Sequence, residues 1–204
     1  MVPVTPDPLR VLVVCTGNVC RSPAVERLLA TGLGAAYRGK RQRGALAPAI
    51  EVSSAGTAAM VGAAMTPETA AIVAALGHDA DGFQARQLTS SLVQRADLVL
   101  ALTRDHRSAV VELHPAAVRR TFTLRELARL VALVEPSELP GAGATTADRL
   151  RALVPLAAVR RGLVPALPAD DDVPDPYGRG EAAYRKTFTL LVPAVETLVA
   201  AVRR

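Results

Sequence analysis

Aromatic residues are scarce in this sequence, which has no tryptophan and only three phenylalanines and three tyrosines among 204 residues. So few rings leave little surface on which the bases of a nucleic acid could stack. The net charge of +5 would suit a polyanion, but the arginines are scattered in short groups, as at 38–43, 119–120 and 160–161. We therefore expect a solvated basic surface that helps to attract anionic substrates, and no nucleic-acid partner.

Cysteine is equally scarce. Cys15 and Cys20 are the two cysteines of the chain, and one pair cannot form a disulfide framework for a protein of this size. The three histidines, His78, His106 and His114, are too dispersed to complete a zinc site, so no metal is expected. A reactive thiol remains as one interpretation, and a pair of small buried apolar side chains as the other.

Long apolar runs are missing as well, since no uninterrupted stretch reaches the roughly 18 residues of a membrane span. The first residues, MVPVTPDPLR, lack the basic and then apolar segments of a secretory signal. We expect a soluble, cytoplasmic protein without membrane contact, and the sequence does not indicate its oligomeric state. Residues 1–8, with three prolines, are expected to be a disordered lead-in. Residues 9–204 are expected to form one domain, with an insertion around 125–168.

Short apolar runs alternate with segments of helical periodicity. The runs at 9–14, 50–54, 96–103 and 120–124 are predicted to be buried strands. Helices are predicted at 24–37, from Thr66-Pro-Glu to Gly77, and at 89–95, 105–114, 145–162 and 181–203. The alternation indicates an α/β fold, a four-stranded parallel sheet flanked by helices, which binds ligands at the carboxyl ends of its strands.

The turn after the first strand, CTGNVCRS at 15–22, carries the strongest chemical pattern. Such a turn directs several backbone N–H groups, and the positive end of the following helix, toward one point, which favours an anion. Gly17 and Asn18 tolerate the positive φ of a tight anion nest. Ser22 is predicted to cap the helix, and Cys15 is expected to have a lowered pKa.

Arg21 adds a planar, bidentate donor for a phosphate-like group. The arrangement favours attack of the Cys15 thiolate on a bound tetrahedral oxyanion, with the Ser22 hydroxyl stabilising the sulfur as a leaving group. Neither a GxxxxGK[ST] nor a GxGxxG pattern is present, so a nucleotide-binding loop is excluded.

CTGNVCRSP resembles the pattern C-x-G-N-x-C-R-S-P of the low-molecular-weight protein tyrosine phosphatases. VPDPYG at 173–178 is similar to a second element of that family, and SAGT at 54–57 and ARQLT at 85–89 are similar to others, in the expected order. The resemblance covers most of the chain but not 125–168. It implies a flavodoxin-like phosphotyrosine phosphatase I fold, a phosphorylated protein as substrate, most often on tyrosine, and no cofactor.

The resemblance also implies a role for each matching residue. Cys15 would be the nucleophile that forms a phosphocysteine, and Asp175 would protonate the leaving oxygen and then activate water. Arg21 and the backbone amides of 16–21 would bind the phosphoryl oxygens. Tyr177 would form a wall of the substrate cleft. The remaining residues of the turn complete the phosphate site: Thr16, Gly17, Asn18, Val19, Cys20 and Ser22, of which Asn18 and Ser22 would hold its shape.

Cys20 allows two interpretations. It could form a reversible disulfide with Cys15, as the resemblance implies, and so guard the nucleophile against over-oxidation. It could equally be a small residue packed beneath the turn.

The sequence departs from the family pattern at three places. Residues 57–68 contain no aromatic side chain to stack on a substrate ring, which leaves Met60 as the largest side chain near the turn at 54–57. Phe83 stands where many relatives have a histidine that supports the turn, although Ser54 could still bond Asn18. The third departure is the length of the 125–168 region.

Three other functions remain possible on this pattern. One is a phosphoarginine phosphatase, although Val19, a small apolar residue, favours phosphotyrosine. Another is an arsenate reductase resolved by a small thiol, because the two further cysteines of a thioredoxin-coupled enzyme are missing. The last is a non-catalytic module that binds phosphoanions, which would need neither the thiol nor the acid.

Overall fold

The computed structural model describes residues 7–37, 49–163, 165 and 167–203. Most of the expected lead-in, residues 1–6, lies outside the described residues. The strands are β1 (Leu9–Cys15), β2 (Ala36–Tyr37), β3 (Ile50–Gly56), β4 (Leu98–Ala101) and β5 (Thr121–Thr123). The α-helices are α1 (Arg21–Leu33), α2 (Pro67–Ala75), α3 (Ser90–Arg95), α4 (Arg104–Leu113), α5 (Leu124–Val131), α6 (Thr146–Arg160), α7 (Pro168–Asp171) and α8 (Glu181–Arg203), and the 3-10 helices are η1 (Pro115–Arg120) and η2 (Pro136–Glu138).

The sheet is parallel and has the strand order β2-β3-β1-β4-β5. The parallel α/β architecture is confirmed, but the prediction of four strands is wrong, because β2 adds a fifth at the edge. The predicted helix 24–37 in fact ends at Leu33, since Gly34 adopts the left-handed conformation with φ of +64°. The two-residue strand that follows is too short to show the alternation by which strands are recognised in a sequence.

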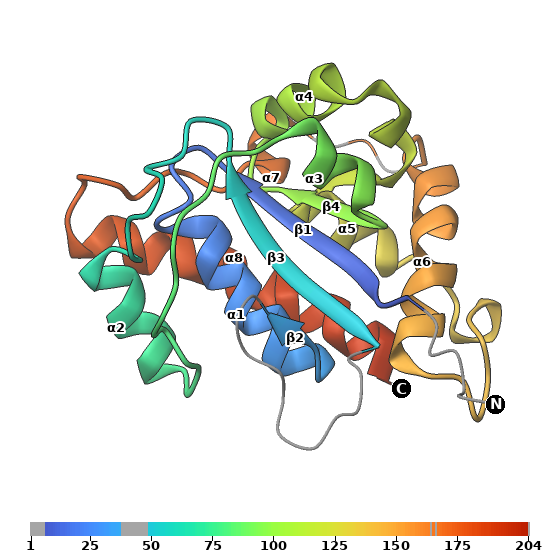
Figure 1. Cartoon of the computed structure of the whole chain (residues 1–204). Coiled ribbons are helices and arrows are strands. Elements are labelled where there is room, and N and C mark those ends of the chain that lie inside the picture. The colour runs from blue at the N-terminus through green and yellow to red at the C-terminus, as the bar shows by residue number, and fades with distance from the viewer. Residues whose placement is uncertain (1–6, 38–48, 164, 166, 204) are drawn as a thin grey trace, which may run out of the picture.

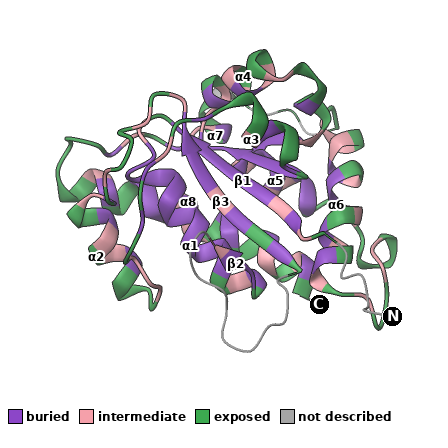
Figure 2. Ribbon diagram, viewed as in Figure 1, coloured by how far each residue is buried: buried purple, intermediate pink, exposed green. Residues whose placement is uncertain are grey.

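Two helical layers cover the sheet, and β1 shows how its residues divide between them. Leu9, Val11 and Val13 pack in one core with apolar residues of α1, α5, α6 and α8. Leu12 and Val14 point to the opposite face, into a smaller core with residues of α3, α4 and η1. Both faces of β1 are therefore buried from Val11 to Cys15, where the ribbon in Figure 2 is purple, which explains the unbroken apolar sequence of this part of the strand.

The central strand β1 lies between β3 and β4, at the point where the order of the strands reverses. In open α/β sheets, ligands bind in the crevice outside the carboxyl ends of the strands at such a point. Figure 1 shows the arrowheads of β1 and β3 directed to the end of the molecule where the turn into α1 and the segment before α8 lie. The fold thus brings 15–22 and 172–180 to one edge of the sheet.

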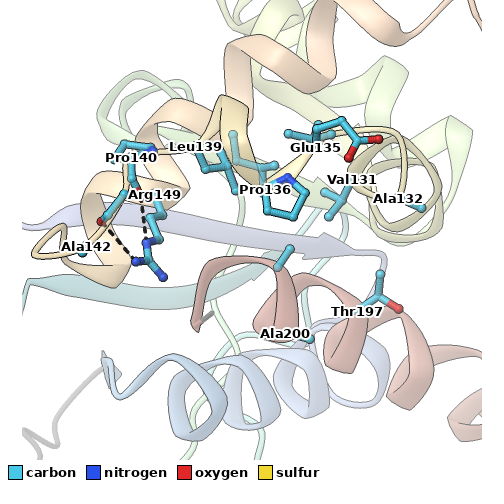
Figure 3. A pocket seen from close by; sticks show the side chains of 14 residues that line it. Val131, Ala132, Glu135, Pro136, Leu139, Pro140, Ala142, Arg149, Thr197 and Ala200 are labelled. Atoms are coloured by element: carbon cyan, nitrogen blue, oxygen red, sulfur yellow. Dashed lines mark hydrogen bonds between the residues drawn. The ribbon is translucent and has the colours of Figure 1, made fainter.

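The segment 125–168 forms most of α5, η2 and α6. Leu150 and Leu153 of α6 are buried in the same core as β1, so this segment packs on the sheet layer. A pocket of about 760 Å³ lies between α5, η2, α6 and α8. Figure 3 shows Arg149 at one end of the pocket, donating to the backbone oxygens of Pro140 and Gly141. Among the described residues, no helix is both long and apolar enough to span a bilayer.

Gly56, the last residue of β3, lies against the backbone of the turn after β1. A Cβ at this position would lie 2.3 Å from the carbonyl oxygen of Thr16. Backbone cannot rotate away as a side chain can, so even one methyl group must displace the turn.

We predict that Gly56→Ala lowers the free energy of unfolding by about 1–3 kcal/mol, the usual cost of overpacking. Urea unfolding measures this change. Gly141→Ala is the control, because no atom lies within 4 Å of the Cβ it would add. Equal stability of the two variants would contradict the close approach.

Candidate active site

The turn from Cys15 to Arg21 is held open by the segment that follows β3. The carbonyl oxygens of Thr16, Gly17 and Val19 accept hydrogen bonds from the backbone N–H groups of Ala58, Met60 and Thr66, at 2.9–3.0 Å. These carbonyls therefore point outward, away from the centre of the turn. Backbone N–H groups are left to line the inner side, as an anion nest requires.

Asn18 is the residue that shapes this turn. It has a φ of +54° and is the one residue other than glycine with positive φ among those described. Gly17, which the sequence also marked for this conformation, does not adopt it. The Asn18 side chain is fully buried; its amide nitrogen donates to Ser22 Oγ at 2.8 Å and to Ser54 Oγ at 2.9 Å, and its oxygen accepts the N–H of Arg86 at 2.9 Å.

Ser22 does not cap the helix as predicted. α1 begins at Arg21 with Cys20 in the capping position, and no side chain accepts from its first N–H groups. The Ser22 hydroxyl lies instead 2.9 Å from Cys15 Sγ. The helix N-terminus is thereby left open to an anion, and the serine is used to hold the sulfur.

The Cys15 sulfur is enclosed by these groups. Burial raises the pKa of the Cys15 thiol, while the Arg21 guanidinium, the Ser22 hydroxyl and the backbone N–H groups of Ser22 and Asn18 act to lower it. The lowered pKa expected from the sequence is therefore wrong for this form of the protein, because the sulfur is cut off from water. Arg21 also shares its charge with a carboxylate, which weakens its effect on the sulfur.

That carboxylate belongs to Asp175. Arg21 is 3% exposed, and its Nη2 lies 2.5 Å from Asp175 Oδ2 and 3.4 Å from Thr16 Oγ1, while its Nη1 donates to the backbone oxygen of Val173 at 3.0 Å. Its Nε is buried without a hydrogen-bond partner among the described residues. Arg21 thus binds the segment before α8 and keeps one buried donor for a ligand.

Asp175 is held by contacts at both ends of its segment. The N–H of Val173 donates to Leu102 O at 2.8 Å, next to the end of β4. Thr187 Oγ1 of α8 donates to the backbone oxygen of Pro174 at 3.0 Å. The Asp175 carboxylate itself is partly exposed and also accepts the N–H of Tyr177 at 3.2 Å.

A pocket of about 210 Å³ joins the turn to the Asp175 segment. Eight of the residues expected in the site line it: Cys15, Thr16, Gly17, Val19, Cys20, Arg21, Asp175 and Tyr177. Ala58 and Met60 complete the wall, and the side chains of Met60 and Tyr177 are exposed. Asn18 and Ser22 lie buried beneath, where they hold the turn.

Comparison with known proteins agrees with this geometry. The family model described as "Low molecular weight phosphotyrosine protein phosphatase" matches residues 10–136, more than half of the chain. The chain belongs to this family. A low molecular weight protein-tyrosine-phosphatase of Streptomyces coelicolor is 33% identical over 95% of this chain and 93% of its own length. The low molecular weight protein-tyrosine phosphatase A of Mycobacterium tuberculosis is 40% identical over 55% of this chain and 64% of its own length.

Solved structures of tyrosine and arginine phosphatases have the same fold. The tyrosine phosphatase AmsI of Erwinia amylovora superimposes with a TM-score of 0.65 at 22% identity, over 97% of this chain and 95% of that one. The YwlE arginine phosphatase of Geobacillus stearothermophilus has a TM-score of 0.64 at 25% identity, over 96% and 94%.

In this low molecular weight phosphatase, sequence analysis missed His106 of α4. The imidazole is 6% exposed, with Nε2 at 2.8 Å from Thr16 Oγ1 and Nδ1 at 2.8 Å from Thr103 Oγ1. His106 therefore supports the Thr16 side chain next to Arg21. The one available signal was Thr103-x-x-His106 directly after β4, a helix start at the same edge of the sheet as Cys15.

Glu26 was missed as well. It lies on α1, one turn beyond Ser22, is 2% exposed, and accepts the hydroxyl of Ser54 at 2.6 Å. The Asn18–Ser54 bond expected from the sequence is present, but the chain of hydrogen bonds continues into a carboxylate. Phe83 packs in an apolar cluster with Cys20 and Tyr184, and it also lines a cavity beside Glu26 and Ser54.

His106 gives a pH-dependent contribution to stability. Burial, followed by the charge of Arg21, lowers the pKa of His106 from 6.5 to about 4. The unfolded chain therefore takes up a proton as the pH falls through 6.5, whereas the folded protein does not until about pH 4. The stabilisation is complete above pH 6.5 and is lost as the pH falls from there to 4.

We predict that the wild type loses about 2–3 kcal/mol more unfolding free energy than His106→Asn between pH 7.5 and pH 4.5. Urea unfolding of both proteins at the two pH values measures the difference. Equal losses would show that His106 is protonated in the folded protein as readily as in the unfolded one.

Proposed function

We propose that this protein is a protein-tyrosine phosphatase, a hydrolase of phosphomonoesters on proteins that works through a phosphocysteine intermediate. The observation that carries the proposal is the pocket in which Cys15, Arg21 and Asp175 converge from distant parts of the chain. A site that only binds phosphate needs the arginine and the nest, but neither an enclosed thiol nor an acid on the opposite wall.

When substrate binds, its phosphoryl group replaces Asp175 as the partner of Arg21. The free Nε offers a first donor to a phosphoryl oxygen, and Nη2 can pass from Asp175 to a second oxygen to form a bidentate pair. Inward N–H groups of the turn and the N-terminus of α1 bind the remaining oxygens. The Asp175 carboxyl, released from the cation, is then available to the leaving oxygen.

The proton needed for this reaction is already in the site. Burial raises the pKa of the Cys15 thiol and so keeps its proton in place, while the carboxylate of Asp175 accepts from the guanidinium of Arg21. Transfer of that proton to Asp175 produces the thiolate nucleophile and the general acid together. Sγ then attacks phosphorus, the S–P bond forms as the P–O bond breaks, and Asp175 protonates the departing oxygen.

Hydrolysis of the phosphocysteine reverses these roles. Asp175 removes a proton from a water molecule, which attacks phosphorus and expels the Cys15 thiolate. The Ser22 hydroxyl, 2.9 Å from the sulfur, stabilises the thiolate as it leaves. No step requires a cofactor, because Arg21 and the backbone N–H groups supply the electrostatic stabilisation.

We predict that Cys15→Ser abolishes release of phosphate from phenyl phosphate, whereas Asp175→Asn lowers kcat by about 10²- to 10⁴-fold. With p-nitrophenyl phosphate as substrate, Asp175→Asn should lower kcat by a smaller factor, because the p-nitrophenolate leaving group needs less protonation. Steady-state assays at pH 5–7 with reduced protein measure both effects. Asp170→Asn is the control, since Asp170 lies in α7, a few residues before Asp175, and accepts the N–H of Leu167 as its hydrogen bond among the described residues.

Two results would contradict the proposal. The first is phosphate release by Cys15→Ser at the wild-type rate. The second is the absence of release by wild-type protein with reduced thiols.

A phosphoarginine substrate is the second candidate, favoured by the likeness to the YwlE arginine phosphatase. Val19 lines the pocket and is almost the shape of threonine, but its apolar methyl group cannot hydrogen-bond a guanidinium. We therefore expect kcat/KM to be higher for phosphotyrosine than for phosphoarginine peptides of the same sequence. Val19→Thr should lower the ratio of kcat/KM for phosphotyrosine to kcat/KM for phosphoarginine. A wild-type kcat/KM that is higher for phosphoarginine would favour the second candidate.

Cys20 is proposed to be the redox partner of Cys15. Its Sγ now lies 3.5 Å from Thr66 Oγ1 and from Tyr184 Oη, so it must turn toward Cys15 to react. Peroxide would oxidise the Cys15 thiolate to a sulfenic acid, and the Cys20 thiol would displace water from it to form a disulfide.

We predict that dithiothreitol restores peroxide-treated wild type but not peroxide-treated Cys20→Ser, each compared with its own untreated activity. Recovery of both proteins to the same extent would show that Cys20 is only a packing residue.

A further inference from the structure

The hydrogen bonds beneath the turn form one chain from Glu26 to Cys15. Ser54 Oγ lies 2.6 Å from Glu26 Oε2, Asn18 Nδ2 lies 2.9 Å from Ser54 Oγ and 2.8 Å from Ser22 Oγ, and Ser22 Oγ lies 2.9 Å from Cys15 Sγ. Glu26, Ser54, Asn18 and Ser22 are each at most 2% exposed. Buried polar atoms are nearly always hydrogen-bonded, so at each step of the chain one atom must donate and its partner must accept.

Each link of this chain has a defined direction if Glu26 is a carboxylate, which only accepts. The Ser54 hydroxyl then donates its single proton to Glu26, and its oxygen accepts from Asn18. The other amide proton of Asn18 goes to Ser22, whose own proton is left for Cys15. The charge of Glu26 thus decides that the sulfur receives a donor.

A flipped Asn18 amide is the competing arrangement. With its oxygen toward the two serines, Asn18 would accept the protons of both Ser22 and Ser54, and Cys15 would lose its donor. The N–H of Arg86, 2.9 Å from Asn18 Oδ1, opposes the flip from one side. Glu26 opposes it from the other by taking the proton of Ser54.

The charges near Glu26 favour the carboxylate. A cavity of about 270 Å³ is lined by Glu26, Ser54, Arg27 and Arg86 together with residues 82–84. The guanidinium of Arg27 is 3.8 Å from the centre of the Tyr37 ring and 5.9 Å from that of Phe83. Two cations therefore line the cavity, with Glu26 as its one acidic residue among the described lining. Arg21 and Asp175 are the charged residues that line the Cys15 pocket.

We propose that Glu26 is a positioning residue: its carboxylate sets the direction of the hydrogen bonds through Ser54 and Asn18, so that the Ser22 hydroxyl donates to Cys15. The role is built on the proposed function, in which that hydroxyl stabilises the thiolate as nucleophile and leaving group. Glu26 does not touch the substrate.

Glu26→Gln tests this proposal with little change of volume. A glutamine can donate to Ser54, which frees the Ser54 proton and permits the flipped Asn18. We expect the pKa of Cys15 to rise by about one unit, so that iodoacetamide inactivates the variant about tenfold more slowly than wild type at equal pH below that pKa. The measurement is the inactivation rate as a function of pH. Inactivation is monitored in two ways: by the loss of phosphatase turnover, and by the loss of binding of vanadate, which competes with substrate for the site.

The direction of the change in the pKa of Cys15 distinguishes an effect of Glu26 through the hydrogen bonds from an effect of its charge through space. A charge acting only through space would oppose the thiolate, so its removal would lower the pKa of Cys15. A lowered or unchanged pKa in Glu26→Gln therefore overturns the proposal. Because alkylation of Cys15 does not depend on hydrolysis, failure of this test is distinct from failure of the phosphatase function.

Two further variants control for structural damage. Ser22→Ala should raise the pKa of Cys15 by a similar amount, and the double variant with Glu26→Gln should show no additional rise, because both act on one bond. Ser54→Ala breaks the chain in the middle and replaces Glu26→Gln if that variant fails to fold. Glu126→Gln, a change at a similarly buried carboxylate that pairs with Arg107 and Arg161, should leave the pKa of Cys15 unchanged. Additive rises in the double variant would overturn the proposal.

Discussion

The left-handed backbone of Asn18 and the three hydrogen bonds of its side chain are the constraint on which the site depends. The positive φ turns the chain so that its carbonyls meet the segment after β3 and its N–H groups face inward. A non-glycine residue in this conformation is disfavoured, and the buried bonds to Ser22, Ser54 and Arg86 offset that cost. A glycine would adopt the backbone more easily but would leave Ser22 without the donor that orients it.

The ion pair of Arg21 and Asp175 imposes a second constraint, because it joins the two halves of the site before substrate arrives. Arg21 is buried, so leaving its charge without a partner would be costly, whereas Asp175 is partly exposed and can return to water. In the proposed mechanism, a phosphate dianion replaces the carboxylate as the partner of Arg21. The same exchange would free Asp175 to act as the acid, so that phosphate binding and preparation of the acid would be one event.

The sequence was most informative where one short segment carries the whole pattern. Cys15 and Arg21 share a turn between a buried strand and a helix, and the Asp-Pro-Tyr pattern distinguished Asp175 from its acidic neighbours. The strand β2 was not predicted, because two residues are too few to show an alternation of apolar and polar side chains. Glu26 and His106 escaped because their roles depend on distant partners: a glutamate on a helix looks like a solvated residue until Ser54 is placed beside it.

The long segment 125–168 also matters to the site, although it contributes no residue to the described lining of the Cys15 pocket. Arg125 Nη1 of α5 donates to the backbone oxygens of Ala169 and Asp172, and Arg129 pairs with Asp171 at 2.5 Å. These contacts fix the chain immediately before Asp175. Since α5 and α6 pack in the same core as β1, Asp175 is held relative to the sheet that carries Cys15. The helices α5 and α6 therefore support the segment in which the proposed acid lies.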